Sequence, residues 1–171
     1  MGSFSVSSIR RRNLLRQLER MSYRDQLTQF GNRYAVDWFV EHEWNGEQIG
    51  VVYCDITGLK KVNDEQGHEA GDRLIIRACE CLAGVFKGYG LYRIGGDEFL
   101  VLCLGIEEKD LREHVEKLRM DMKEHQVTMA VGMIWKEHGP KDIDLLLNES
   151  ERLMYEDKDR YYKEHGLKRR R

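Results

Sequence analysis

The sequence predicts an α/β (α+β) fold in which helices flank a central mixed, mostly antiparallel five-stranded sheet. Two short apolar runs, 49–54 and 99–104, have the length and composition of buried strands. Amphipathic stretches with a helical period lie between the apolar runs and would cover the faces of the sheet. The pair Gly95-Gly96 separates two apolar runs and predicts a two-residue hairpin turn with positive φ angles. Since a hairpin pairs its strands antiparallel, the sheet cannot be purely parallel.

The length and composition are typical of a single soluble domain. The chain has 171 residues, of which 41% are hydrophobic and 34% are charged. No apolar run is long enough to cross a bilayer, so we expect a cytoplasmic protein whose segment here makes no membrane contact. The net charge of -2 offers no general attraction for a nucleic-acid backbone. Four cysteines within apolar segments, at spacings that match no zinc or disulfide framework, predict reduced core thiols: Cys54, Cys79, Cys81 and Cys103.

Three segments are expected along the chain: residues 1–24 as a leader and signalling helix, 25–165 as the main domain, and 166–171 as a basic tail. Within the first segment, residues 10–24 carry one narrow apolar stripe among charged neighbours, which predicts a helix. This helix either packs back on its own domain or forms a short parallel coiled coil with a second copy, continuing upstream into another domain. The stripe consists of Leu14, Leu15, Leu18 and Met21.

The main domain is expected to open with a turn and a helix. Residues 25–33 contain Asp, Gly and Asn and indicate a turn-rich break. Residues 33–43 return to a helical period, and Asn45-Gly46 ends that helix. The aromatic residues of the helix are expected on its apolar face: Tyr34, Trp38 and Phe39.

A buried strand over 49–54 then delivers Asp55 to its carboxyl end, which is where ligands bind in open α/β sheets. The residues that follow, 56–71, are polar and punctuated by glycine. A helix is expected from about Asp72, since an acid in the first turn is favoured by the helix dipole. Its buried side would contain Leu74, Ile75, Ala78, Cys81, Leu82, Val85 and Phe86.

The second half of the domain continues the same alternation of strands and helices. Residues 99–104 are apolar at every position, which predicts a central strand covered on both faces. Gly139-Pro140 marks a break before the last helix. The expected elements are strands over 89–94 and 97–104, a charged helix near 107–123, a strand over 126–135 and a helix over about 142–164.

Acidic residues gather at the ends of two predicted strands. Asp55 ends the first strand, and Asp97 and Glu98 directly follow the glycine pair. If these strands are neighbours, the carboxylates repel one another unless a cation lies beside them. Hard oxygen ligands suit one or two Mg²⁺ ions, and such sites serve phosphoryl and nucleotidyl transfer. The alternative is an ordinary hairpin whose acids are solvated.

Four blocks of residues, in order along the chain, resemble the GGDEF family of diguanylate cyclases. The blocks are the intact signature Gly95-Gly96-Asp97-Glu98-Phe99, the opening motif Asp25-Gln26-Leu27-Thr28 with Asn32-Arg33, the polar block 55–72, and Met154-Tyr155-x-x-Lys158. The resemblance covers about residues 15–165 and makes 25–165 the catalytic domain. It implies a fold similar to the catalytic domains of nucleotide cyclases and palm-type polymerases. It also implies condensation of two GTP molecules into cyclic di-GMP with release of pyrophosphate.

The resemblance also implies which residues act in catalysis. Asp55, Asp97 and the carbonyl of Ile56 would bind Mg²⁺ or Mn²⁺. Asp97 would accept the proton of the attacking 3′-hydroxyl, and Glu98 would be the neighbouring acid of the metal cluster. Gly95 and Gly96 would form the signature turn.

The substrate residues implied by the resemblance lie in the polar block and the last helix. Asn63 and Asp72 would bind the guanine edge, because a carboxylate can accept from guanine N1–H and N2–H₂ in a way that adenine does not satisfy. His68 would lie near the nucleotide. The triphosphate would contact Lys60, Lys158 and the backbone amides around Leu59. Taken singly, each residue also fits a plainer role as a turn residue, a surface side chain or a solvated charge.

The chain departs from the family pattern at several positions. Thr57 replaces a second Asp, Leu59 replaces Phe, and Tyr162 replaces an Arg that often contacts phosphate. The product-inhibition motif Arg-x-x-Asp is absent, because Phe86 and Tyr89 occupy its charged positions. We therefore expect no feedback inhibition by that route.

A functional cyclase is expected to need two copies of the chain. Two GTP molecules must face each other antiparallel, so each chain would hold half of the active site. The resemblance also implies an upstream sensory domain in a longer protein. The alternative is a domain that binds GTP without catalysis and signals to an attached domain.

Overall fold

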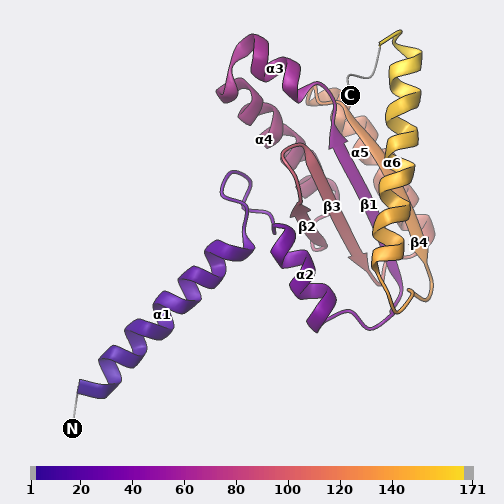
Figure 1. Cartoon of the computed structure of the whole chain (residues 1–171). Helices are drawn as coiled ribbons and strands as arrows, with labels where there is room; N and C mark the ends of the chain where they lie inside the picture. Colours follow the sequence, from indigo (N-terminus) through magenta and orange to yellow (C-terminus); the bar gives the residue numbers. More distant parts are fainter. Residues whose placement is uncertain (1–2, 168–171) are drawn as a thin grey trace.

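The computed structural model describes residues 3–167, and for residues 3–6 and 19–21 it describes the backbone alone. The first residues of the expected leader and residues 168–171 of the basic tail lie outside this part. Among the described residues, no helix has the length and apolar character needed to span a membrane. In chain order (Figure 1), the elements are α1 (Ser3–Tyr23), α2 (Arg33–His42), β1 (Ile49–Ile56), α3 (Leu59–Gln66), α4 (His68–Val85), β2 (Gly90–Arg93), β3 (Glu98–Leu104), α5 (Glu108–Glu124), β4 (Met129–Lys136) and α6 (Asp144–Glu164).

The sheet has four strands within the described residues, in the order β2-β3-β1-β4, and all neighbouring strands are antiparallel. The expected count of five strands is therefore wrong. At the free edge of β2, residues 25–31 form a turn, as the sequence predicted. The Asp25 carboxylate accepts hydrogen bonds from the amide and hydroxyl of Thr28, and Gln29 adopts a left-handed φ of 61°. Pairing there is limited to isolated bridges, Arg24 with Gly31 and Gly31 with Tyr92.

Helices cover both faces of the sheet (Figure 1). Helices α4 and α5 pack on one face, and α2 and α6 pack on the other. Every residue of β1 is buried, and its alternate side chains enter the two cores: Val52 and Cys54 on one face, Val51 and Tyr53 on the other. This arrangement confirms the predicted α/β fold, and β3 is a central strand as predicted. All four cysteines are buried and free of disulfide bonds.

The polar segment after β1 contains a short helix, α3. Gly58, with a φ of 83°, precedes α3, and Gly67, with a φ of 88°, separates α3 from α4. Glycine is suited to both positions because it adopts left-handed angles without steric cost. Asp72 therefore lies in the second turn of α4, and the expected helix start at Asp72 is wrong. Two of the glycines that punctuate this segment are thus the boundaries of a short helix.

Helix α2 buries a narrower face than expected. Val36 and Phe39 are buried against the sheet, as the i and i+3 positions of one stripe. Tyr34 and Trp38 are exposed, so the prediction that they share the apolar face with Phe39 is wrong. The two exposed rings lie four residues apart on a different side of the helix.

Helix α1 extends away from the rest of the domain (Figure 1). It begins at Ser3 and so includes most of the expected leader and all of the predicted helix up to Tyr23. Its leucines Leu14, Leu15 and Leu18 are each about half exposed, at 56%, 49% and 51%. The sequence left open whether this stripe packs on its own domain or forms a coiled coil with a second copy. These leucines are not packed on their own domain.

Candidate active site

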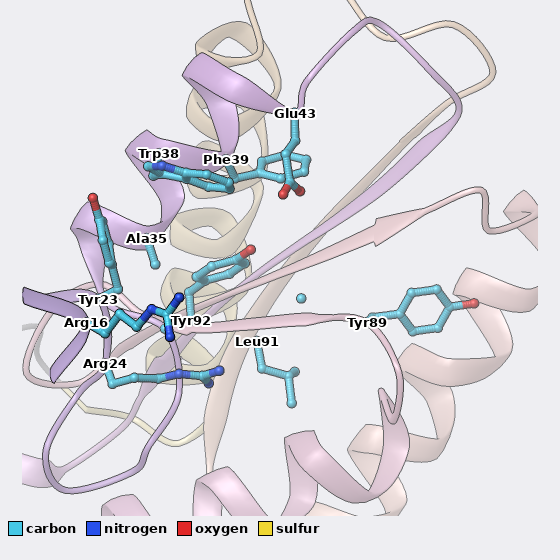
Figure 2. Close-up of a pocket in the computed structure, with 12 residues that line it drawn as sticks. Arg16, Tyr23, Arg24, Ala35, Trp38, Phe39, Glu43, Tyr89, Leu91 and Tyr92 are labelled. Carbon is cyan, nitrogen blue, oxygen red and sulfur yellow. The ribbon is translucent and has the colours of Figure 1, made fainter. Parts of the chain in front are cut away.

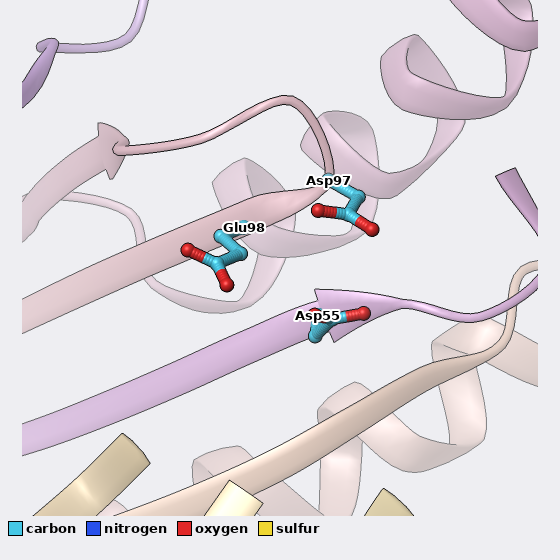
Figure 3. A group of neighbouring side chains, drawn as sticks. All are labelled: Asp55, Asp97 and Glu98. Carbon is cyan, nitrogen blue, oxygen red and sulfur yellow. The ribbon is translucent and has the colours of Figure 1, made fainter. Parts of the chain in front are cut away.

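Three acids meet where β1 ends and β3 begins (Figure 3). In the antiparallel register Asp55 lies directly opposite Glu98, and the Ile56 amide donates to the carbonyl of Asp97 at 2.8 Å. Carboxylate oxygens of Asp55, Asp97 and Glu98 all lie within 4.8 Å of one another. The predicted cluster depends on β1 and β3 being neighbours, and the sheet order meets that condition.

The cluster concentrates negative charge at a partly buried position. Asp55 is 3% exposed, and burial raises its pKa to about 6, with Asp97 adding to the rise. Lys158 on α6 opposes this rise, because its Nζ lies 3.2 Å from Asp55 Oδ1. Three hard oxygen donors at this spacing, one of them on the buried Asp55 with its raised pKa, fit a divalent cation.

Tyr53 contacts the cluster and was not predicted from the sequence. Its hydroxyl donates to Glu98 Oε2 at 3.1 Å. Burial raises the pKa of Tyr53, and the Glu98 carboxylate adds to the rise, so the phenol remains a donor. The signal that could have found it is spacing, since residues two apart on a strand point to the same face. Tyr53 and Asp55 are such a pair.

The turn before Asp97 differs from the expected two-residue hairpin. Strand β2 ends at Arg93, and the Ile94 amide donates to the carbonyl of Glu98 at 3.0 Å, so a longer turn connects the strands. Neither Gly95 nor Gly96 adopts a positive φ, which makes that prediction wrong. Gly95 is instead favoured by close approach: a Cβ there would lie 3.1 Å from Glu98 Oε2. A Cβ on Gly96 would meet no atom within 4 Å.

Arg93 ties this turn to the start of the domain. Its Nη2 and Nε donate to the carbonyl of Gly96 at 2.8 and 3.2 Å, and its Nη1 lies 3.1 Å from Asp25 Oδ2. Burial of Asp25 opposes ionisation, but the hydrogen bonds from Thr28 and the Arg93 guanidinium outweigh it and lower the pKa of Asp25. The opening motif therefore supports the signature turn through one ion pair.

Replacing Asp25 by Asn is expected to lower the free energy of unfolding by about 1–2 kcal/mol near neutral pH, because it removes a charge-assisted hydrogen bond. A lowered folded pKa stabilises the protein above the unfolded value of about 4, and this contribution is lost as pH falls through the folded value. Denaturant unfolding of both proteins at several pH values measures the difference, which should shrink in acid. Exposed Asp37→Asn is the control. A difference that is constant with pH would contradict the assigned ion pair.

The predicted substrate residues lie on α3, on the first turns of α4 and on α6. Gly71 lets the two helices approach, because a Cβ there would lie 1.7 Å from Asn63 Oδ1. This contact places Asn63 beside the residue that precedes Asp72. Exposed residues of this group are Lys60, His68 and Asp72, and the half-buried ones are Leu59, Asn63 and Lys158.

Aromatic residues occupy the two positions where the GGDEF family pattern has the charged residues of the product-inhibition motif. Phe86 is fully buried, and its ring centroid lies 5.6 Å from that of His114 on α5. Tyr89 meets the same histidine edge-on, with centroids 6.2 Å apart. These two positions thus present rings to a neighbouring helix where the motif would present a cation and an acid.

A cavity of about 730 Å³ lies away from the acids, between α1, α2 and β2 (Figure 2). The guanidinium groups of Arg16 and Arg24 line it together with the rings of Tyr92 and Trp38. Tyr89 lines this cavity, whereas no residue of the acid cluster does. The cavity and the acid cluster are therefore separate features of the domain.

Antiparallel strands flanked by helices, with three acids gathered where two central strands meet, define an α/β domain with a candidate metal site at one edge of its sheet. The family model described as diguanylate cyclase, GGDEF domain, matches residues 22–163. The chain belongs to the GGDEF family.

Curated relatives of this chain carry names with different activities. The chain is 29% identical over 92% of its length to the bifunctional diguanylate cyclase/cyclic di-GMP phosphodiesterase MucR of Pseudomonas aeruginosa, covering 25% of that protein. It is 28% identical over 80% of its length to the diguanylate cyclase DgcP of Escherichia coli, covering 45% of it. It is 30% identical over 79% of its length to the cyclic di-GMP phosphodiesterase PdeR of Escherichia coli, covering 22% of it. The chain thus spans less than half the length of these relatives.

A solved structure shares the fold. The coiled coil and GGDEF domain of DgcB from Caulobacter crescentus, in complex with c-di-GMP, superposes with a TM-score of 0.79 at 22% identity. The alignment covers 91% of each chain. At this identity the likeness establishes the architecture, and the activity has to be argued from the residues.

Proposed function

We propose that this chain is a diguanylate cyclase that joins two GTP molecules into cyclic di-GMP and releases two pyrophosphates. The observation that carries the proposal is the meeting of Asp55, Asp97 and Glu98 within 4.8 Å at the end of two central strands. A domain that only binds nucleotide has little use for such a crowded group of acids. Membership of the GGDEF family and the intact signature support the same reaction.

Asp55, Asp97 and the carbonyl of Ile56 are the proposed ligands for Mg²⁺ or Mn²⁺. Their donor atoms are all oxygen, as these ions prefer. The bound ion would lower the pKa of a hydroxyl and neutralise leaving phosphates. The 3′-oxygen of one GTP would attack the α-phosphorus of the other, and Asp97 would accept the proton of that 3′-hydroxyl. The bond from that phosphorus to the bridging oxygen then breaks, and pyrophosphate leaves.

The neighbouring helices would select and hold the nucleotide. Asn63 and Asp72 would contact the guanine edge, and the close packing of Asn63 on Gly71 supports their joint action. Lys60 and the amides around Leu59 would contact the phosphates, with His68 nearby. Lys158, which pairs with Asp55 at 3.2 Å, is already beside the acids and would contact the triphosphate when an ion neutralises them.

The proposed reaction needs two chains. Each chain would bind one GTP, and the two nucleotides would face each other antiparallel across the encounter. The exposed leucine stripe of α1 supports a parallel coiled coil between two copies. The greater length of the relatives supports a sensory domain upstream of α1 in a longer protein.

Incubation of the protein with GTP and Mg²⁺ over a range of protein concentrations, followed by chromatographic identification of products, tests the proposal. Cyclic di-GMP should form at a rate that rises faster than linearly with protein concentration, because the active species is a dimer. GTP that binds but stays intact at every concentration, even with dimerisation forced by a fused coiled coil, would overturn it.

A GTP-binding sensor without catalysis is the second candidate. The replacements Thr57, Leu59 and Tyr162 near the expected nucleotide positions favour it. The same incubation separates the two functions, because a sensor binds GTP and leaves it intact.

A further inference from the structure

Tyr53 occupies a place in β1 where a hydroxyl is unexpected. The strand reads Ile49-Gly50-Val51-Val52-Tyr53-Cys54, and all of these residues are buried. Tyr53 itself is 4% exposed and packs in the core between the sheet, α2 and α6. A buried phenol needs a hydrogen-bond partner, whereas an aliphatic side chain would fill the same core without that requirement.

The register of the sheet directs this hydroxyl to the acid cluster. Tyr53 lies opposite Leu100, and Asp55 lies opposite Glu98, so Tyr53 and Glu98 are diagonal neighbours on one face. Diagonal pairs are within reach of an aromatic side chain. The Tyr53 hydroxyl accordingly donates to Glu98 Oε2 at 3.1 Å.

Glu98 is the member of the cluster that most needs such a restraint. Its side chain has more rotatable bonds than that of an aspartate, and the charges of Asp55 and Asp97 repel it. Gly95 leaves space for its carboxylate, since a Cβ there would lie 3.1 Å from Oε2. A carboxylate that accepts one hydrogen bond keeps further lone pairs for a cation.

We propose that Tyr53 is a positioning residue that holds the Glu98 carboxylate in the acid cluster and thereby sets its affinity for a divalent cation. The inference rests on the proposed function in one respect, namely that the cluster binds Mg²⁺ or Mn²⁺. Glu98 is not one of the ligands proposed above, but its carboxylate belongs to the group of three acids that could hold an ion. Hydrogen bonds to the residues of a metal site commonly fix the orientation of those residues, and Tyr53 would do so from a rigid strand.

The test is Tyr53→Phe, which removes one oxygen atom and keeps the ring. Titration of the full chain with Mn²⁺, with free Mn²⁺ measured by electron paramagnetic resonance, should show affinity weakened by about tenfold. The Mg²⁺ concentration for half-maximal cyclase activity should rise by a similar factor, while the KM for GTP at saturating Mg²⁺ stays unchanged. Tyr92→Phe is the matched control, because Tyr92 also pairs with Leu100 and packs in the same core.

A double-mutant cycle separates positioning from a general effect on the fold. In a Glu98→Gln background, Tyr53→Phe should cause no further loss of Mn²⁺ affinity, since the carboxylate it positions is gone. A loss that persists in that background would overturn the proposal. Equal Mn²⁺ binding by wild type and Tyr53→Phe would also overturn it, but would leave the cyclase proposal intact. A wild-type protein that binds no Mn²⁺ would overturn both, so the two failures are distinguishable.

Discussion

Replacing Asp97 by Ala is expected to lower the rate of cyclic di-GMP formation by at least about a thousandfold, the scale of a lost group that stabilises charge in the transition state. Asp97 lies in the acid cluster within 4.8 Å of Asp55 and Glu98. Its carboxylate is the proposed proton acceptor and metal ligand, so both contributions are lost together. The measurement is the initial rate of product formation at saturating GTP and Mg²⁺, at a protein concentration where wild type is dimeric.

Binding and folding controls identify the cause of that loss. GTP should still bind to Asp97→Ala, because the proposed guanine contacts lie on α3 and α4. Asp110→Asn changes an exposed acid on α5 and should keep full activity. If Asp97→Ala retained more than about a tenth of the wild-type rate, Asp97 would not be the proton acceptor, since such groups contribute far more than tenfold. In a sensor, the same variant would keep its signalling output.

Placing aspartates at Leu14 and Leu18 is expected to abolish cyclase activity at low protein concentration. These leucines are 56% and 51% exposed on a helix that extends from the domain (Figure 1). Charge in the seam of a coiled coil opposes association. In the proposed reaction, a chain without a partner would hold only half of the active site. A coiled coil raises the effective concentration of the catalytic domains to about the millimolar range, so its loss should lower the rate per chain by at least about a hundredfold.

Concentration and rescue test whether the loss arises from dimerisation. Sedimentation or light scattering should show the Leu14→Asp/Leu18→Asp variant as a monomer where wild type is a dimer. A fused, unrelated coiled coil should restore its activity. Gln17→Ala, an exposed polar position on the same helix, is the control. Full activity of the double variant as a monomer would show that one chain suffices, which would contradict the two-chain reaction.

The sequence alone determined the features that depend on local pattern. The apolar run of β3 identified a central strand, because only a strand buried on both faces is apolar at every position. The order of strands and helices predicted the α/β fold. The signature and the position of Asp55 at a strand end predicted the acid cluster, since strand ends are where a sheet presents side chains to a ligand.

The tertiary structure decided which distant residues touch. Lys158 lies 3.2 Å from Asp55, although more than a hundred positions separate them in the sequence. Tyr53 contacts Glu98 on the neighbouring strand. The role of a glycine also depends on the tertiary structure, because a glycine pattern does not distinguish a positive φ from a close approach. Gly95 is an example of close approach. The local sequence pattern encodes the type of each element and which of its residues are buried. The register of the strands and the docking of the helices determine which side chains touch. The acid cluster was therefore predictable from sequence, but the contacts of Lys158 and Tyr53 with it were not.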